Sequence, residues 1–345
     1  MTGSGAAGTV TERVELGERS YDVVVGHGAV AALPGMLPPS ARRVAIVTQR
    51  GVPIDVASIV GSGRSVSVHV IGDGESHKSL ATIEALSRDF ARAGITRNDV
   101  IVGVGGGMVT DVAGFAAASW HRGTAVVHVA TTLVGMVDAA IGGKTGVNIA
   151  EGKNLVGAFW QPCGVVCDLD ALATLSEREV RCGNGEMAKY HFLTGDDLLS
   201  MDTAARIARC VRIKADIVGT DERESGRRAL LNYGHTLAHA LETTTDHDLA
   251  HGEAVAIGLM YAARLARVLG RIDDARVARH HDVIVDHYGL SVRLPSGASH
   301  DELVAVMSRD KKALDGLTFV LDGPRGVEVV SDVPHAAVTA ALAAM

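Results

Sequence analysis

The stretch Val102-Gly-Val-Gly-Gly-Gly-Met-Val-Thr-Asp111 decides the fold, because it has the pattern of a buried strand, a glycine turn and the start of a helix. Glycines at such a turn let the backbone approach a pyrophosphate, and the helix start supplies unpaired N–H groups and a partial positive charge. Met108 stands where the usual dinucleotide fingerprint has its third glycine. The pattern therefore predicts a strand–turn–helix unit, and it leaves open whether a nucleotide or only a tight turn requires the glycines.

Strands and helices alternate on both sides of this stretch. Short β-branched runs predict strands at residues 21–25, 43–48, 67–71, 99–104, 124–129 and 165–168, and apolar spacing predicts helices at 80–93 and 109–119. Later in the chain, helical periodicity covers 204–218, 227–243, 252–270 and 273–287, before a small hairpin at 317–321 and 326–330 and a terminal helix from Pro334. We therefore expect a flexible tail (1–12), an α/β lobe (13–175) and a mainly α-helical lobe (176–345).

Composition excludes several classes of protein. The chain has 345 residues, 47% of them hydrophobic, which suits two packed lobes. A net charge of −7, a pI of about 6.1 and only five Phe, five Tyr and two Trp argue against a nucleic-acid partner. The most apolar segment, 123–143, is interrupted by His128, Asp138 and glycines, so we expect no membrane span, and residues 1–10 lack a signal-peptide pattern. The expected location is the cytoplasm.

The four cysteines form no C-x-x-C pair, which favours buried, reduced thiols.

A second glycine-rich stretch, Ile141-Gly-Gly-Lys-Thr145, presents a lysine. It is not a nucleotide P-loop, because Asp138 occupies the position where that loop requires its first glycine. Lys153 and Asn154 follow closely. Two lysines and an amide among glycines suit a phosphate or polyhydroxyl ligand, although exposed surface lysines would give the same pattern.

The stretch Asn232-Tyr-Gly-His-Thr-Leu-Ala-His-Ala-Leu-Glu242 places His235 and His239 at i and i+4, with Asn232 and Arg228 expected on the same helical face. His251 is expected near the start of the next helix, and Glu186 and Lys189 lie one turn apart. Imidazole and carboxylate groups suit a divalent metal. A metallopeptidase H-E-x-x-H motif is excluded, because Thr236 stands in place of the glutamate. A purely structural histidine pair stays open at this point.

These residues belong to a longer series of motifs that resembles 3-dehydroquinate synthase, a family of sugar-phosphate cyclases. The motifs follow one another in family order over residues 20–332, which is nearly the whole chain. They are Asp73-Gly-Glu-Ser-His-Lys78, Gly105-Gly-Gly-Met-Val-Thr-Asp111, Arg122-Gly123, Thr131-Thr132, Met136-Val-Asp138, Gly142-Gly-Lys-Thr-Gly146, Gly152-Lys-Asn154, Asn232-Tyr-Gly-His235, Leu249-Ala-His-Gly-Glu253 and Asp310-Lys-Lys312.

The resemblance implies that the α/β lobe (13–175) binds the nucleotide and that the helical lobe (176–345) binds the metal and the substrate. It also implies a homodimeric enzyme that uses NAD and a divalent metal, zinc or cobalt. The implied metal ligands are Glu186, His235 and His251. The implied NAD contacts are Asp73, Gly74, Glu75, Lys78, Gly105, Gly106, Gly107, Met108, Val109, Thr110, Asp111, Thr131, Thr132, Asp138, Lys144, Lys153, Leu172 and Thr174. The implied substrate contacts are Lys144, Asn154, Lys189, Lys214, Arg228, Asn232, His239, Lys312 and, from the neighbouring subunit, Arg122.

The resemblance also implies a reaction of the shikimate pathway, which leads to aromatic amino acids. The substrate, 3-deoxy-arabino-heptulosonate 7-phosphate, is transiently oxidised at C5, loses phosphate, is reduced again and closes to 3-dehydroquinate by an aldol step. His239 would accept the C5 hydroxyl proton, and Lys144, Lys189 and Asn232 would complete the catalytic set. Lys144, Asn154 and Arg122 would hold the phosphate, whereas Arg228 with Lys214 would hold the carboxylate.

One segment departs from the family pattern. Lys189-Tyr-His-Phe-Leu193 replaces the usual Lys-x-Gly, and the chain between Glu186 and His235 is shortened. This segment, with Gly316-Leu-Thr-Phe-Val-Leu and Gly323-Pro-Arg-Gly, also resembles the aminodehydroquinate synthases, which use an amino analogue of the substrate. We place 3-dehydroquinate synthase first. The alternatives are an aminodehydroquinate synthase, a cyclase of sedoheptulose 7-phosphate, a metal-dependent dehydrogenase of the glycerol dehydrogenase type and an inactive NAD-binding regulator.

Overall fold

The computed structural model describes residues 8–244, 249–309 and 317–345. The chain divides into two compact units, which we call the N-terminal unit (1–176 with 203–219) and the helical unit (177–202 with 220–345). The expected boundary at 175/176 therefore needs one change, because the helix α6 (Thr203–Thr220) belongs almost wholly to the N-terminal unit. Lys214 and Arg212 tie α6 to that unit through ion pairs with Asp138 and Glu12.

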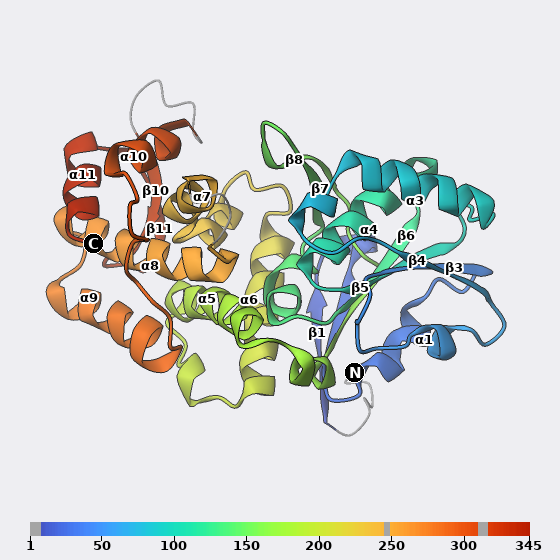
Figure 1. The fold of residues 1–345 in the computed structure, drawn as a ribbon. Helices are drawn as coiled ribbons and strands as arrows, with labels where there is room; N and C mark the ends of the chain where they lie inside the picture. Colours follow the sequence, from blue (N-terminus) through green and yellow to red (C-terminus); the bar gives the residue numbers. More distant parts are fainter. Residues whose placement is uncertain (1–7, 245–248, 310–316) are drawn as a thin grey trace. The chain divides into compact units, whose positions relative to one another are not determined.

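The N-terminal unit contains the expected α/β sheet (Figure 1). The strands lie in the order β1-β2-β9-β6-β5-β3-β4, and all neighbours are parallel except β1 and β2. Their bounds are β1 (Thr9–Val14), β2 (Tyr21–Gly26), β3 (Arg43–Thr48), β4 (Ser65–Val70), β5 (Val100–Gly105), β6 (Ala125–Ala130) and β9 (Gly164–Asp168). The expected tail over 1–12 is therefore wrong for its last residues, because β1 pairs with β2 from Thr9 onward.

Both faces of this sheet are covered, which explains why its central strands are continuous apolar runs. The helices α3 (Leu80–Arg92) and α4 (Gly107–Ser119) contribute Phe90 and Val112 to the core on one face. The other face packs against η2 (Ala29–Ala32), α1 (Leu33–Met36) and α2 (Ala57–Val60). The remaining short elements are η1 (Gly17–Arg19), η3 (Glu75–His77), η4 (Trp120–Arg122), η5 (Gly135–Ala139) and η6 (Leu169–Thr174).

A hairpin of β7 (Lys144–Ile149) and β8 (Gly152–Phe159) follows the second glycine-rich stretch. The sequence predicted only a turn there, because glycine and polar residues interrupt the alternation that marks a strand. A Cβ on Gly157 would lie 2.1 Å from the Thr145 backbone oxygen, so glycine is needed for the two strands to approach. Lys144, Lys153 and Asn154 therefore project from a hairpin and not from a loop.

The helical unit is built around α8 (His251–Val268), a helix that is buried on almost every side. The elements of this unit are α5 (Glu177–Thr194), η7 (Leu198–Ser200), η8 (Arg227–Asn232), α7 (His235–Thr244), α9 (Asp274–His281), η9 (Asp282–His287), α10 (His300–Arg309), the hairpin β10 (Leu317–Leu321) and β11 (Glu328–Val333), and α11 (His335–Ala343). The expected continuous helix over 227–243 is wrong. Gly234 has φ +80 and its hydrogen faces Leu259, so the chain turns between η8 and α7.

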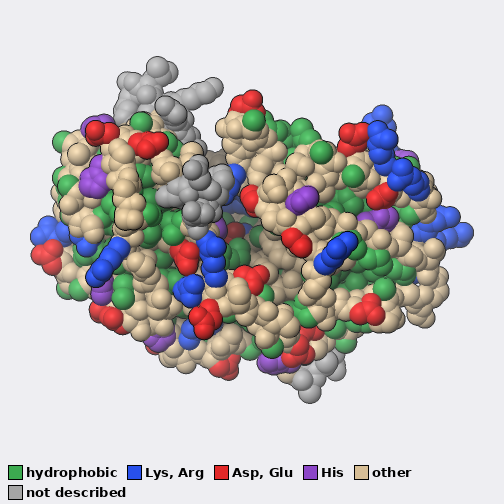
Figure 2. All heavy atoms as spheres, viewed as in Figure 1, with side chains coloured by type: hydrophobic (Ala, Val, Ile, Leu, Met, Phe, Trp, Pro, Cys, Tyr) green, Lys and Arg blue, Asp and Glu red, His purple; other side chains and the backbone are tan. Residues whose placement is uncertain are grey.

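On the face viewed in Figure 2, Lys and Arg side chains are interspersed with Asp and Glu. No helix within the described ranges is both long and apolar enough to cross a membrane. The four cysteines are free, but only Cys167 and Cys210 are buried as expected, because Cys163 is exposed and Cys182 is partly exposed.

Candidate metal centre and nucleotide-binding unit

Three side chains of the helical unit converge on one point. His235 at the start of α7 and His251 at the start of α8 both direct Nε2 at the same oxygen of Glu186 in α5, at 3.3 and 3.0 Å from Oε1. One ligand atom from each of the three residues lies within 4.8 Å of the others. Glu186 is fully buried, and Lys189 one turn later places Nζ 2.5 Å from its Oε2. The sequence predicted these residues, and the fold brings them together.

Glycines beside the three ligands explain how the helices come so close. A Cβ on Gly185 would lie 2.1 Å from the Gly252 oxygen, and one on Gly252 would lie 1.8 Å from the Cys182 oxygen. A Cβ on Gly258 would lie 1.9 Å from the Gly234 oxygen. Real Cβ atoms do not approach this closely, so α5, α7 and α8 can meet only where these residues lack side chains. Gly185, Gly252 and Gly234 each precede or follow a candidate ligand directly.

The outer nitrogens of the two histidines have acceptors of their own. Nδ1 of His235 donates to the Tyr233 backbone oxygen at 3.1 Å, and Nδ1 of His251 lies 3.5 Å from Oε1 of Glu242. Such contacts fix the ring orientation and leave Nε2 directed at the metal position. The sequence analysis missed Tyr233 and Glu242. Glu242 could have been predicted, because it lies seven residues, or about two helical turns, after His235. The Tyr233 backbone oxygen could not, because every residue has a backbone oxygen.

The protonation states of Glu186, His235 and His251 depend on one another. Burial would raise the pKa of the Glu186 carboxyl, but Lys189 and His235 outweigh burial and hold that pKa well below its usual range. Burial lowers the pKa of His235. Burial opposes protonation of His251 as well, yet its hydrogen bonds to Glu186 and Glu242 raise its pKa well above the ordinary value. An ionised Glu186 beside a neutral His235 and a protonated His251 is therefore the resting state, and a metal would displace the extra proton from His251.

This donor set fits a divalent metal. Two imidazole nitrogens and one carboxylate oxygen form the three-ligand arrangement that catalytic zinc sites use, and outer contacts already orient both rings. A second group, His281, Asp282 and Asp286, also has closely spaced donor atoms, but all three residues are exposed. Because exposed acidic groups are common without a metal, the buried set is the stronger candidate.

The other predicted residues of the helical unit lie near these elements. His239 is exposed, and its ring centre lies 5.6 Å from that of His235. Asn232 donates to Oε1 of Glu224 at 2.6 Å, and Arg228 is buried with its guanidinium hydrogen-bonded to the Glu222 backbone oxygen. Because η8 ends at Asn232, Arg228 and Asn232 do not continue the helical stripe of His235 and His239, as the sequence had predicted.

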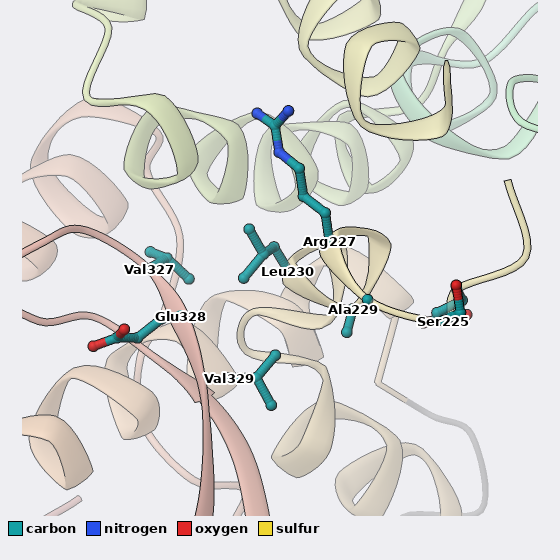
Figure 3. Close-up of a pocket in the computed structure, with 9 residues that line it drawn as sticks. Ser225, Arg227, Ala229, Leu230, Val327, Glu328 and Val329 are labelled. Carbon is teal, nitrogen blue, oxygen red and sulfur yellow. The ribbon is translucent and has the colours of Figure 1, made fainter. Parts of the chain in front are cut away.

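A hollow of about 500 Å³ lies beside η8. Figure 3 shows that Leu230 extends towards Val327 on the opposite chain segment, while the Arg227 guanidinium extends away from it. The lining contains none of the candidate metal ligands. We place the chemistry at the buried ligand set, because converging ionisable groups mark a reactive site better than the volume of an open hollow does.

In the N-terminal unit, the glycine turn is shaped by close packing. A Cβ on Gly103 would lie 2.7 Å from Cβ of Ala113, and one on Gly106 would lie 2.9 Å from Cγ2 of Thr132. The first places α4 against β5, and the second lets the 131–132 segment approach the turn. The helix start at Gly107 is suited to an anionic group.

Three predicted residues meet beside this turn. Lys78 is buried and places Nζ 2.5 Å from both Oδ2 of Asp111 and Oδ1 of Asn154. Burial raises the pKa of Asp111, and the Lys78 ammonium opposes that increase. Asn148 extends the group, because it accepts from the Asn154 backbone at 2.8 Å and donates to Glu75 at 2.7 Å. Asn148 was not predicted, since only the hairpin brings it to this position.

The remaining predicted residues are placed as follows. Lys214 donates to the backbone oxygen and to Oδ1 of Asp138, both at 2.7 Å, so these two residues are paired with each other. Arg122 is exposed, with φ +62. Lys312 lies outside the described residues. Asp73 and Gly74 precede η3, Gly105 to Thr110 form the turn and first helical turn, Lys144 and Lys153 lie in the β7–β8 hairpin, and Leu172 and Thr174 lie in η6.

These features define a class of protein in which an α/β unit with a glycine turn is joined to a helical unit with a buried metal-type ligand set. Two adjoining family models match the chain, 3-dehydroquinate synthase N-terminal over residues 68–182 and 3-dehydroquinate synthase C-terminal over 183–313. The chain belongs to the 3-dehydroquinate synthase family. The family predicted from the motifs is thereby confirmed.

Individual relatives agree with the family models. The chain is 53% identical over 327 residues to a candidate aminodehydroquinate synthase of Amycolatopsis mediterranei (strain S699), covering 94% of this chain and 92% of the relative. It is 46% identical over 310 residues to the 3-dehydroquinate synthase of Thermobifida fusca (strain YX), covering 84% of each.

Solved structures of related cyclases have the same fold. A 2-deoxy-scyllo-inosose synthase complexed with carbaglucose-6-phosphate, NAD⁺ and Co²⁺ matches with a TM-score of 0.87 and 25% identity, over 96% of this chain and 98% of that one. The 2-epi-5-epi-valiolone synthase of Streptomyces hygroscopicus subsp. jinggangensis 5008, with NAD⁺ and Zn²⁺ bound, matches with a TM-score of 0.83 and 28% identity, over 94% and 96%. The predicted fold class is confirmed.

Proposed function

We propose that this chain is a 3-dehydroquinate synthase, a phosphate-eliminating lyase that converts 3-deoxy-D-arabino-heptulosonate 7-phosphate to 3-dehydroquinate and phosphate. The observation that carries this proposal is the buried set of Glu186, His235 and His251 in a member of that family. The Thermobifida fusca synthase, 46% identical, supports the choice of substrate.

Two bound groups are part of the proposal. NAD would accept and return a hydride at C5, and zinc or cobalt held by the three ligands would polarise the hydroxyl oxygens so that a proton leaves more readily. The structures of two relatives, described with NAD⁺ and Co²⁺ or Zn²⁺, support both assignments. The glycine turn at the start of α4, with Lys78 and Asp111 beside it, would receive the dinucleotide.

The protein's own side chains accept protons and keep the candidate ligand Glu186 ionised. His239 is exposed beside His235, so its imidazole can accept the C5 hydroxyl proton and exchange it with solvent. The ketone formed at C5 acidifies the C6 proton, which leaves as the C–O bond to phosphate breaks. Return of the hydride to C5 would allow the ring to open, and the aldol step would then form the carbocycle without net oxidation. Lys189 keeps Glu186 ionised throughout, because its ammonium lies against that carboxylate.

Phosphate and carboxylate recognition would use cationic and amide groups. Lys78 holds Oδ1 of Asn154, so the amide NH₂ of Asn154 is the end that can donate to a phosphate oxygen. Lys144 would contribute a charge from the same hairpin, and Arg228 would bind the carboxylate through its planar guanidinium. Lys214 would bind the substrate only after it exchanges its contacts with Asp138 for the substrate.

The assembly and the location are proposals of the same kind. A homodimer in which Arg122 reaches the neighbouring subunit's substrate fits the exposed position of that side chain. Mixing an Arg122→Ala chain with a chain inactivated at His239 should restore about a quarter of the activity if the sites are shared. Cell fractionation would test the proposed cytoplasmic location.

One assay tests the reaction itself. Purified protein with zinc or cobalt and a catalytic amount of NAD should release inorganic phosphate from 3-deoxy-D-arabino-heptulosonate 7-phosphate, with no net accumulation of NADH. Phosphate release only from sedoheptulose 7-phosphate would indicate a different cyclase. Accumulation of NADH with a simple polyol would indicate a dehydrogenase and would overturn the proposal.

A second candidate is an aminodehydroquinate synthase. It is favoured by the relative from Amycolatopsis mediterranei, 53% identical over 94% of the chain, and by the unusual segment Lys189-Tyr-His-Phe-Leu193. The two substrates differ in one hydroxyl or amino group, so kcat/KM for each, measured on the same preparation, decides between the candidates. A higher value for the amino analogue would replace our first choice.

A further inference from the structure

The unusual segment after Lys189 contributes an aromatic contact to the interior of the helical unit. Phe192 is buried in α5 and stacks on His280 of α9, with ring centres 3.9 Å apart and an angle of 8° between the ring planes. His280 is itself completely buried. The two rings therefore lie flat against each other, and each limits how far the other can turn.

The hydrogen bonds of His280 define which nitrogen carries the proton. Nδ1 lies 2.8 Å from the backbone oxygen of Arg276, and a carbonyl oxygen can only accept, so Nδ1 is the donor. Nε2 lies 2.8 Å from the Tyr233 hydroxyl, which therefore donates to it. Asp322, 3.8 Å from Nε2, is paired with Arg276 at 2.6 Å. Burial lowers the pKa of His280 to about 4, so the neutral ring is its ordinary state.

Tyr233 connects this buried group to the metal-type ligand set. Its hydroxyl is fixed by His280, and its backbone oxygen accepts the Nδ1 proton of His235 at 3.1 Å. Gly234, at φ +80, turns the chain so that the oxygen of one residue faces the ring two residues later. A movement of Tyr233 would therefore rotate the imidazole of His235 away from Glu186.

We infer that Phe192, His280 and Tyr233 form a positioning network that holds His235 in the orientation of a metal ligand. The three are positioning residues and not catalytic ones, since they act through His235. This inference rests on the proposed metal centre. It gives the departure from the family pattern at residues 190–192 a role in the metal centre.

The test measures metal affinity without substrate or NAD. Tyr233→Phe removes the hydroxyl and keeps the ring, and the dissociation constants for Zn²⁺ and Co²⁺ are measured by competition with a chelator, together with the visible spectrum of the Co²⁺ form. Loss of an outer partner of a metal ligand typically weakens binding by about 10-fold or more. Tyr233→Phe keeps the backbone oxygen that His235 contacts and only loosens its position, so we expect affinity to weaken by up to about 10-fold and the Co²⁺ spectrum to change. An unchanged affinity and spectrum would overturn the inference.

A matched control and a double variant separate positioning from stability. Tyr261→Phe removes another buried hydroxyl of the same unit, which donates to Val338 at 3.4 Å and leads to no ligand, so metal affinity should stay at the parent value. Tyr233→Phe combined with His280→Phe removes both polar partners, so the apo protein should regain stability. Metal affinity should stay weak in this double variant. If affinity recovers together with stability, the single change acted through folding and the network does not position His235.

A reference variant distinguishes failure of the network from failure of the metal centre. His235→Ala should lose metal affinity more severely than Tyr233→Phe, because it removes the ligand itself. If His235→Ala binds metal as tightly as the parent, the ligand assignment is wrong, and the proposed function fails with it. If His235→Ala loses metal and Tyr233→Phe does not, only the network is refuted.

Discussion

Replacing Gly252 with alanine should disable the proposed metal centre without removing any of its three candidate ligands. The new Cβ would lie 1.8 Å from the backbone oxygen of Cys182. A carbon and a carbonyl oxygen approach to about 3.3 Å, so α5 and α8 would have to separate by roughly 1.5 Å at this point. Neither atom belongs to a flexible side chain, so the collision cannot be relieved by a rotamer change.

The separation matters because Glu186 lies on α5 and His251 on α8, close to the collision. Metal–ligand distances tolerate only about 0.2 Å of change, which is several times less than the required movement. We therefore expect at least about a 10-fold loss of zinc affinity, comparable to the loss of an outer ligand partner. Overpacking should also lower the free energy of unfolding by about 1–3 kcal/mol.

The assay combines metal content of the purified protein, chelator competition for zinc and thermal unfolding of the metal-free chain. Gly35→Ala is the control, because a Cβ at that exposed position meets no heavy atom within 4 Å. It should bind zinc and unfold like the parent. If Gly252→Ala binds zinc as tightly as Gly35→Ala does, the close crossing of α5 and α8 does not determine the ligand geometry, and the reasoning is refuted.

Three further substitutions test other parts of the two units. His251→Ala should lose zinc and turnover together, whereas His281→Ala in the exposed cluster should lose neither; unchanged metal content in the first variant contradicts the ligand assignment. Burial lowers the pKa of His128 to about 4 from an ordinary value near 6.5, so its contribution to stability is complete above pH 6.5 and is lost as the pH falls towards 4. His128→Gln should flatten that part of the melting-temperature profile, and an identical slope in both proteins would argue against this origin. Asp138→Ala leaves the buried Lys214 ammonium without its carboxylate, so urea denaturation should show that the free energy of unfolding falls by about 3 kcal/mol. A decrease below about 1 kcal/mol would mean that the pair contributes no more than an exposed ion pair does.

The sequence predicted the sheet well because its strands are determined by burial on both faces. The expected run 43–48 coincides with β3, and 124–129 differs from β6 by one residue at each end. Such apolar runs keep their structure in almost any packing arrangement. The candidate metal ligands were singled out for a related reason, since burying histidines and a carboxylate on apolar helices is costly unless these groups are paired or bind a ligand.

The sequence pattern predicted the wrong secondary structure where tertiary contacts determine the backbone conformation. The periodicity over 227–243 is that of one helix, yet the Gly234–Gly258 contact divides it into η8 and α7. The β7–β8 hairpin was missed, because Gly146 and Gly157 weaken the strand pattern for the sake of a close approach. The Tyr233 oxygen could not be predicted at all, since every residue has a backbone oxygen and only the turn at Gly234 selects this one.

The third glycine of the dinucleotide fingerprint is missing, but the close helix–strand packing that it normally allows is still present. That glycine normally allows the helix to pack closely on the strand before it. Here a Cβ on Gly103 of β5 would lie 2.7 Å from Cβ of Ala113 in α4, and one on Gly114 of the same helix would lie 2.3 Å from Cγ2 of Thr145 in β7. The close packing is therefore supplied from other positions, and Met108 is free to contact Gln49 through its sulfur at 3.2 Å. A substitution of Gly103 or Gly114 by alanine should consequently disturb the turn more than Met108→Gly would improve it.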